Sequence, residues 1–162
     1  MATFSAKTSA DAVVPVERAR IWEALVDPEL VGRLTPFVKK ITADGDHWLW
    51  DMSGLDLLGV RVAPQFTELM TFEDQTRIEF HHDPPDGKSE RAGVNGWYQL
   101  GDSSDARGGT DLSTHLQICL SAPLPRLSSP AVTAAMKGVM ATMGVRFSKN
   151  LLDHLGVRSK AV

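Results

Sequence analysis

The residues best suited to hold a ligand by contact are methionines in the last third of the chain. Met136, Met140, Met143 and Phe147 follow one another at intervals of four, three and four, which places them on one face of a helix. Methionine is unbranched and polarizable, so a row of methionines adapts to apolar molecules of varied shape. The same spacing is typical of a helix that packs against a core. Two interpretations therefore stay open, a packing face and the wall of a ligand cavity.

A second group of candidate ligand contacts lies in the extended segments before this helix. Tryptophan and tyrosine carry a large apolar ring and one polar atom, so they stack on a planar ligand and also orient it. Trp97 and Tyr98 are adjacent and must point to opposite faces of a regular strand. The candidate ligand-binding residues in these segments are Trp48, Trp50, Phe66, Phe80, His82, Asn95, Trp97, Thr114 and Leu116.

His82 is the histidine best placed to act on a bound molecule. It shares a predicted strand face with Ile78 and Phe80, so we expect it to point inward. There an imidazole would donate to a ligand carbonyl or act as an acid or base. The alternative is a partly solvated position at the strand end, beside the turn-rich segment DPPDG.

Glu68 has an unusual position for an acid. It shares strand parity with Phe66 and Met70, which are apolar. A bulge at Pro64 would switch the face and turn Glu68 to solvent. Because a buried charge needs a partner and the sequence names none, we expect a solvated surface position.

Nucleophilic and metal chemistry have little support in the sequence. There is no G-x-S-x-G motif, and Cys119 lies on a predicted strand with no evident base nearby. The histidines show no HExxH spacing, and there is no C-x-x-C pair. We therefore expect no metal, no cofactor and no catalytic residue; a binding protein is favoured, and an enzyme stays open as an alternative.

Three leucines occupy a short segment where a turn is expected. Leu55, Leu57 and Leu58 lie in SGLDLLG, between two glycines. Turns seldom need three leucines, so the segment would fold back as a plug, form a dimer contact, or act as a hydrophobic lid at a cavity mouth.

Length and charge exclude several classes of protein. The 162 residues suit one domain spanning 1–162, and the net charge of −3 without a basic run argues against a nucleic-acid partner. No segment approaches the ~18 apolar residues of a membrane span. The N-terminus does not resemble a signal peptide, and a single cysteine fits a reducing compartment, so we expect a cytoplasmic protein.

The order of predicted elements defines the fold class. A strand at 4–14 precedes two short helices ending near Pro36, and strands of period two then run from 38 to about 122. One long helix follows at about 130–155, with Gly156 as its C-cap. The sequence therefore predicts an α+β fold in which a curved antiparallel sheet wraps around a long C-terminal helix.

This order resembles the START-like superfamily, also called the SRPBCC, polyketide cyclase/dehydrase or helix-grip group. The residues that carry the resemblance are VPVERARIWEALVDPELVGRLTPFVKKI (14–41), GGTDLSTHLQICLSAPLPRL (108–127) and the helix end NLLDHLGV (150–157). The resemblance covers nearly the whole chain and implies a cavity between the sheet and the long helix. In many members that cavity binds lipids, steroids or polyketides.

Three functions follow as expectations. The first is binding or sequestration of a small hydrophobic or amphipathic molecule, lipid-like or polyketide-like, in the internal cavity. The second is a cyclase, dehydratase or aromatase, which would require an inward His82 or an acid with a perturbed pKa. The third is an interaction module, either a chaperone cofactor or a homodimer built on the leucine-rich segment.

Overall fold

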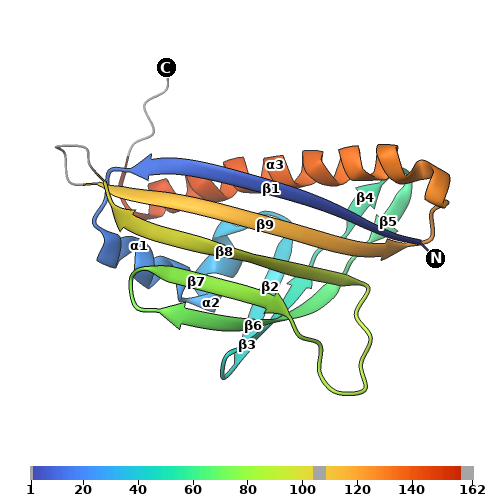
Figure 1. The fold of residues 1–162 in the computed structure, drawn as a ribbon, viewed down its shortest axis with the longest axis horizontal. Coiled ribbons are helices and arrows are strands. Elements are labelled where there is room, and N and C mark those ends of the chain that lie inside the picture. The colour runs from blue at the N-terminus through green and yellow to red at the C-terminus, as the bar shows by residue number, and fades with distance from the viewer. Residues whose placement is uncertain (1, 104–108, 158–162) are drawn as a thin grey trace.

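Seven antiparallel strands form one strongly curved sheet, and a long C-terminal helix lies along its concave side (Figure 1). The computed structural model describes residues 2–103 and 109–157. The strands of this sheet are β1 (Ala2–Val14), β2 (Val38–Asp44), β3 (His47–Met52), β6 (Gln65–Glu73), β7 (Arg77–His82), β8 (Ala92–Asp102) and β9 (Thr110–Ala122). The other elements are α1 (Arg18–Leu25), α2 (Pro28–Leu34), the hairpin β4 (Leu55–Leu57) and β5 (Val60–Val62), the 3-10 turn η1 (Arg126–Ser128), and α3 (Ser129–His154).

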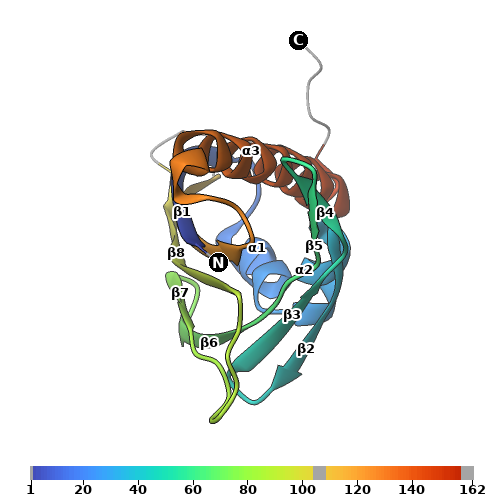
Figure 2. The same ribbon diagram turned by 90° about the vertical axis from the view of Figure 1, so that its right-hand side faces the viewer.

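The strand order is β1-β9-β8-β7-β6-β3-β2, so the first strand pairs with the last along its whole length. Seen end-on, α3 spans the open side of the curve, and α1 and α2 lie at one end of it (Figure 2). Asp27 begins α2 by accepting a hydrogen bond from the backbone N–H of Leu30, at 3.3 Å, and Pro28 occupies the first turn. The expected α+β architecture is confirmed.

Strand register decides which side chains face α3. Directly paired residues of antiparallel strands lie on the same face, and the registers connect Met70 to Phe80, Phe80 to Gly96 and Gly96 to Leu116. Met70 and Phe80 are buried in the core, which makes this the inner face of the sheet. Every second residue from these positions along β6, β7, β8 and β9 therefore points toward the helix.

The helix α3 is attached to the rest of the fold along its flanks. It packs against the edge strand β1 on one side and against α2 and β4 on the other. Among the described residues, β7, β8 and β9 do not pack against it to the same extent. Asn150 Nδ2 donates to the carbonyl oxygen of Leu34 at 2.9 Å, and Arg20 Nη2 donates to that of Leu155 at 2.9 Å. Gly156 ends the helix with a φ of 78°, as a glycine C-cap requires.

The leucine-rich segment forms the hairpin β4–β5 beside α3. Leu57 is buried, Leu55 is half-buried, and the turn residues Leu58 and Gly59 have φ values of 50° and 80°. Leu58 is 50% exposed at the tip. Leucine is uncommon at such a backbone angle, where glycine or asparagine costs less. The proposed lid role of these three leucines stays a prediction.

No helix among the described residues is long and apolar enough to cross a membrane.

Candidate functional site

Among the charged residues that the structure describes, Glu68 is the one that the fold buries most completely, and it lies on the inner face of the sheet. Its side chain is 3% exposed. The strand β6 starts directly after Pro64 and pairs with β3 and β7 without a register shift, so no bulge turns Glu68 outward. The surface position expected from the sequence is therefore wrong. The strand parity that Glu68 shares with Phe66 and Met70 correctly indicated a buried position.

Burial makes this carboxyl group an unusually weak acid. Desolvation raises the pKa of Glu68 from 4.5 to about 8, because the ionised form loses its hydration, and the Trp50 side chain opposes the rise. That opposing effect is a hydrogen bond from the Trp50 indole N–H to the carboxyl group, which favours the ionised form. Near neutral pH Glu68 is thus mainly a neutral acid, able both to donate and to accept a hydrogen bond.

Tyr98 shares this interior with Glu68. The register pairs Tyr98 with Ile78, which is fully buried, so its ring points inward. Burial, and next the charge of Glu68, raise the pKa of the Tyr98 hydroxyl. The Tyr98 and Phe80 rings lie 5.4 Å apart between centroids. Tyr98 was absent from the sequence-based set, although its alternation with Val94 and Leu100 indicated an inward face.

Apolar side chains surround these polar groups. On α3, Met136 and Met140 are buried, while Met143 and Phe147 are only part-buried. The Trp50 and Phe66 rings stack at 5.7 Å with an interplanar angle of 14°. Several inner-face side chains of β8 and β9 are part-buried although they face the helix, namely Tyr98, Leu112, Thr114, Leu116 and Ile118. Trp48 pairs with Glu68 on the same face and is buried.

Two residues of the sequence-based set lie on the opposite, convex face. Trp97 stacks on His115 with ring centroids 5.9 Å apart, and the Arg77 guanidinium lies 4.8 Å from the Trp97 ring centre. Asn95 uses its side-chain oxygen to accept a hydrogen bond from the His82 backbone N–H at 2.9 Å. Neither side chain belongs to the interior that holds Glu68, because strand alternation places them on the other side of β8.

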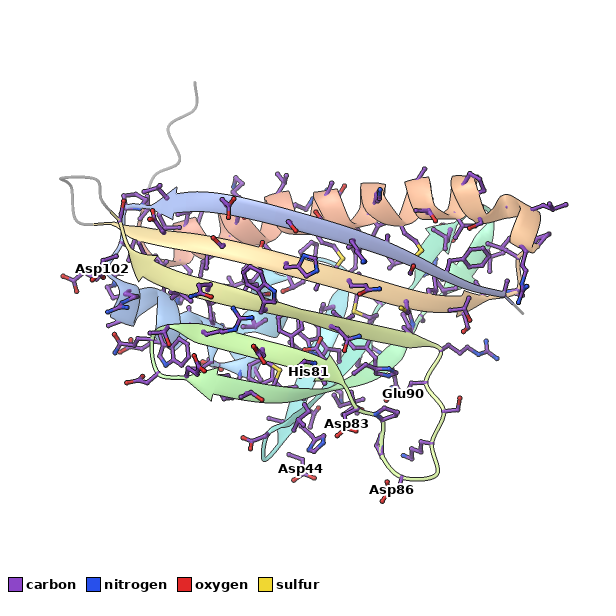
Figure 3. The ribbon with its side chains drawn as sticks, in the orientation of Figure 1. Asp44, His81, Asp83, Asp86, Glu90 and Asp102 are labelled. Carbon is purple, nitrogen blue, oxygen red and sulfur yellow. The ribbon has the colours of Figure 1, made fainter. Side chains whose placement is uncertain are left out.

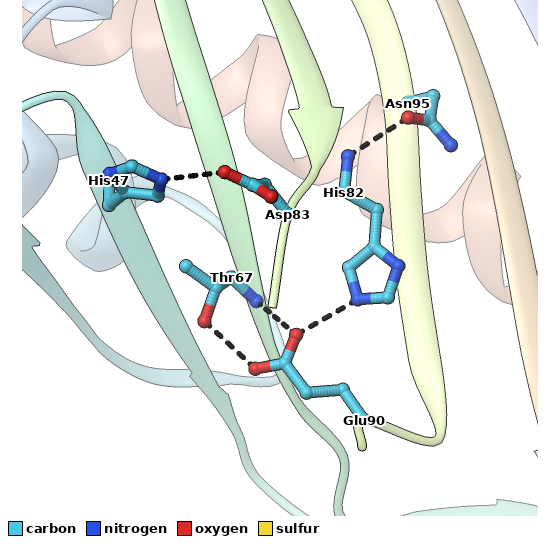
Figure 4. Close-up of polar contacts among 6 residues, drawn as sticks. All are labelled: His47, Thr67, His82, Asp83, Glu90 and Asn95. Carbon is cyan, nitrogen blue, oxygen red and sulfur yellow. Dashed lines mark hydrogen bonds and ion pairs between the residues drawn. The ribbon is translucent and has the colours of Figure 1, made fainter. Parts of the chain in front are cut away.

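His82 holds the connection between β7 and β8 (residues 83–91) against the sheet. Its Nε2 lies 2.9 Å from Glu90 Oε1, and Glu90 also accepts hydrogen bonds from the Thr67 backbone N–H and hydroxyl, both at 2.8 Å (Figure 4). At the start of the connection, His47 Nε2 lies 2.8 Å from Asp83 Oδ2. The His82 ring is thus engaged with Glu90 at the strand end, and its contact with a ligand stays a prediction.

Replacing Glu90 with alanine is expected to destabilise the protein by about 2 kcal/mol, because the buried Thr67 N–H and hydroxyl lose their acceptor. Urea unfolding followed by circular dichroism measures the change. Asp86→Asn is the matched control, since Asp86 lies exposed in the same connection while Glu90 lies at the sheet (Figure 3). Equal effects of the two substitutions would contradict an anchoring role for Glu90.

Other features of the described structure do not suggest a site. Two surface hollows of about 320 and 340 Å³ are lined by residues 11–13 with 111–113, and by Ala2, Thr3, Phe4, Arg126 and Ser129. Neither borders Glu68, Trp50 or Tyr98. Among the residues that the structure describes, no three histidine, cysteine, aspartate or glutamate side chains gather as ligands for a metal ion.

Comparison with solved structures identifies the fold. A conserved protein from Geobacillus kaustophilus superposes with a TM-score of 0.71 at 14% identity, covering 93% of this chain and 95% of that one. A START superfamily protein from Mycobacterium smegmatis gives 0.62 at 13% identity, covering 91% and 95%. The chain has the START-like, helix-grip fold.

A third helix-grip structure, the Zhui aromatase/cyclase of a Streptomyces species, gives a TM-score of 0.66 at 12% identity, covering 93% of each chain. No family model matches the sequence. No curated protein matches it either. At these identities the helix-grip likeness establishes the fold alone, so the function must be argued from the interior residues.

Proposed function

We propose that this helix-grip protein binds and sequesters a small, largely apolar molecule between the inner face of its sheet and α3. The observation that carries the proposal is the part-buried state of Leu112, Leu116 and Ile118, apolar side chains that face the helix from β9, the strand next to the edge strand β1. The helix packs against the sheet at β1 rather than at β9. A ligand in contact with them would gain about 25 cal/mol for each Å² of apolar surface buried, before the cost of association.

A second candidate function is acid catalysis on a polyketide-like substrate, as in a cyclase or dehydratase. The observation that favours it is Glu68, whose pKa of about 8 keeps the acid protonated near neutral pH on the inner face. One protein of the same fold is an aromatase/cyclase. Conversion of a poly-β-ketone substrate by the wild type, but not by Glu68→Gln, would favour this function over sequestration.

Native mass spectrometry of the purified protein, compared with the same sample after denaturation, tests the binding function. We expect a small mass that stays with the folded chain and is lost on denaturation. Leu116→Trp should lower its occupancy at least about fivefold, because the larger ring fills the space next to Gly96.

Gln117→Trp is the matched control for this experiment. It adds the same ring at the next position of β9, on the outer face. We expect it to leave occupancy unchanged. Absence of any adduct, with no rise in melting temperature across a panel of lipids and aromatic polyketides, would contradict the proposal and favour the interaction module.

A further inference from the structure

We propose that the bound molecule enters the interior from the side, between the second half of β1 and the second half of α3. This β1–α3 opening is bordered by Thr8, Ala10 and Ala12 on the strand and by Gly144 on the helix. The inference rests on the proposed binding function and names its entrance and the kind of ligand that passes it. β1 and α3 run beside each other from the same end of the molecule, and each shows the opening independently (Figure 1).

The exposure of β1 changes half-way along the strand. On its inner face Phe4 and Ala6 are buried. The inner-face residues that follow are exposed, namely Thr8, Ala10 and Ala12. The register pairs Thr8 with Leu116, so these exposed side chains lie on the face that points toward the helix. Since they face α3 and are nevertheless exposed, the helix leaves this half of the strand uncovered.

The helix has a matching gap on its inward stripe. Gly144 lies four residues after Met140 and seven before Leu151, so the three share one face of α3. Met140 and Leu151 are buried, whereas Gly144 is exposed, and a Cβ atom there would meet nothing within 4 Å. None of the described residues between Met140 and Leu151 is buried, over a length of about 16 Å. Open space therefore lies beside this part of the helix.

The side chains that border the β1–α3 opening indicate what it admits. They are small and uncharged, and none carries a ring. A flexible apolar chain needs neither a counter-ion nor an aromatic surface, because it gains many weak contacts along its length. Leu116 and Met143 lie next to the opening and are only part-buried, so a chain that passes it meets apolar surface at once. The ligand class that fits is a molecule with an unbranched apolar chain.

Stopped-flow fluorescence with cis-parinaric acid tests the entrance. This linear fatty acid emits more strongly in apolar surroundings, so both its association and its dissociation can be followed. Gly144→Phe places a ring in the opening, and we expect it to slow both rates at least about fivefold while Kd changes less than about twofold. A blocked entrance raises the barrier in both directions, whereas a side chain that only contacts the bound ligand changes Kd.

Gly138→Phe is the matched control in the same helix. A Cβ atom at Gly138 would also meet nothing within 4 Å, but Gly138 lies seven residues before Val145, on the solvent side, where Val145 is 72% exposed. We expect both rates to stay at their wild-type values. Each variant replaces a glycine inside a helix, so neither should lower the melting temperature measured by circular dichroism. A lower melting temperature for Gly144→Phe alone would show that the space is filled, and would overturn the entrance.

A second pair of variants tests the strand side of the opening. Ala10→Phe adds a ring to the inner face of β1 and should slow both rates as Gly144→Phe does. Ser5→Phe adds the same ring to the outer face of β1 and should change neither rate.

The outcomes separate the entrance from the function. Wild-type rates in both Gly144→Phe and Ala10→Phe, or a weaker Kd caused only by faster dissociation, overturn the entrance and leave the binding function standing. An adduct in native mass spectrometry without binding of the linear probe overturns the ligand class and the entrance argued from it. No adduct and no binding of the probe overturn the binding function and the entrance with it.

Discussion

Replacing Glu68 with glutamine is expected to abolish a loss of stability that the wild type undergoes between about pH 5 and pH 8. The cause is the difference between the pKa of about 8 in the folded protein and the ordinary value of 4.5. Below pH 4.5 both states hold the proton, so Glu68 imposes no pH-dependent cost. Between the two values the unfolded chain releases a proton that the folded chain retains, and stability falls as pH rises.

The expected size of this effect is large for one residue. Each pH unit in the window removes about 1.4 kcal/mol, so three units remove on the order of 4 kcal/mol. Above about pH 8 both states are ionised and the slope ends. Glutamine has no proton to lose, so the variant's free energy of unfolding should not show this fall between pH 5 and pH 8. Urea unfolding at half-unit steps from pH 4.5 to 8.5 measures both curves.

Glu79→Gln is the control. It makes the same substitution at a carboxyl group whose pKa is lowered, not raised, in the folded protein. The hydrogen bond from Arg77 lowers the pKa of Glu79, which lies on the outer face of β7. Its contribution is lost only as pH falls, so this substitution should leave the slope from pH 5 to 8 intact. Parallel curves for the wild type and Glu68→Gln would show that Glu68 is hydrated, and would remove the neutral acid from the proposed site.

Gly96→Ala is expected to destabilise the protein by about 3 kcal/mol. A Cβ atom at Gly96 would lie 2.1 Å from the carbonyl oxygen of His115 and 2.8 Å from the Phe80 ring. The carbonyl belongs to the backbone of β9, so β8 and β9 would have to separate or the Phe80 ring would have to move. Because Phe80 contacts Tyr98, the same change should weaken binding of any interior ligand.

Gly101→Ala provides a comparison within the same strand. A Cβ atom there meets nothing within 4 Å, so we expect a change within about 0.5 kcal/mol. Thermal unfolding of the two variants side by side measures the difference. If both are as stable as the wild type, the close approach of β8 and β9 at Gly96 is more adaptable than the structure indicates.

Local patterns in the sequence determined most of the fold. The period-two strands, the Asp27-Pro28 start of α2, and the long apolar stripe that ends at Gly156 each depend on residues close together in the chain. Capping, alternation and helical periodicity are local effects, so they are visible without tertiary structure. The same local logic separated Trp97 from Tyr98, although it did not say which of the two points inward.

Only the tertiary structure decided the site. Whether Glu68 is buried depends on unbroken pairing of β6 with both neighbours, and Pro64 left a bulge open from the sequence alone. The role of His82 depends on Glu90 and Thr67, which reach it from other segments. Register and burial are set by contacts between segments distant in the chain, and a one-residue shift exchanges the two faces of a strand. For that reason the sequence placed Trp97 among the ligand contacts, while the fold places Glu68, Trp50 and Tyr98 on the inner face.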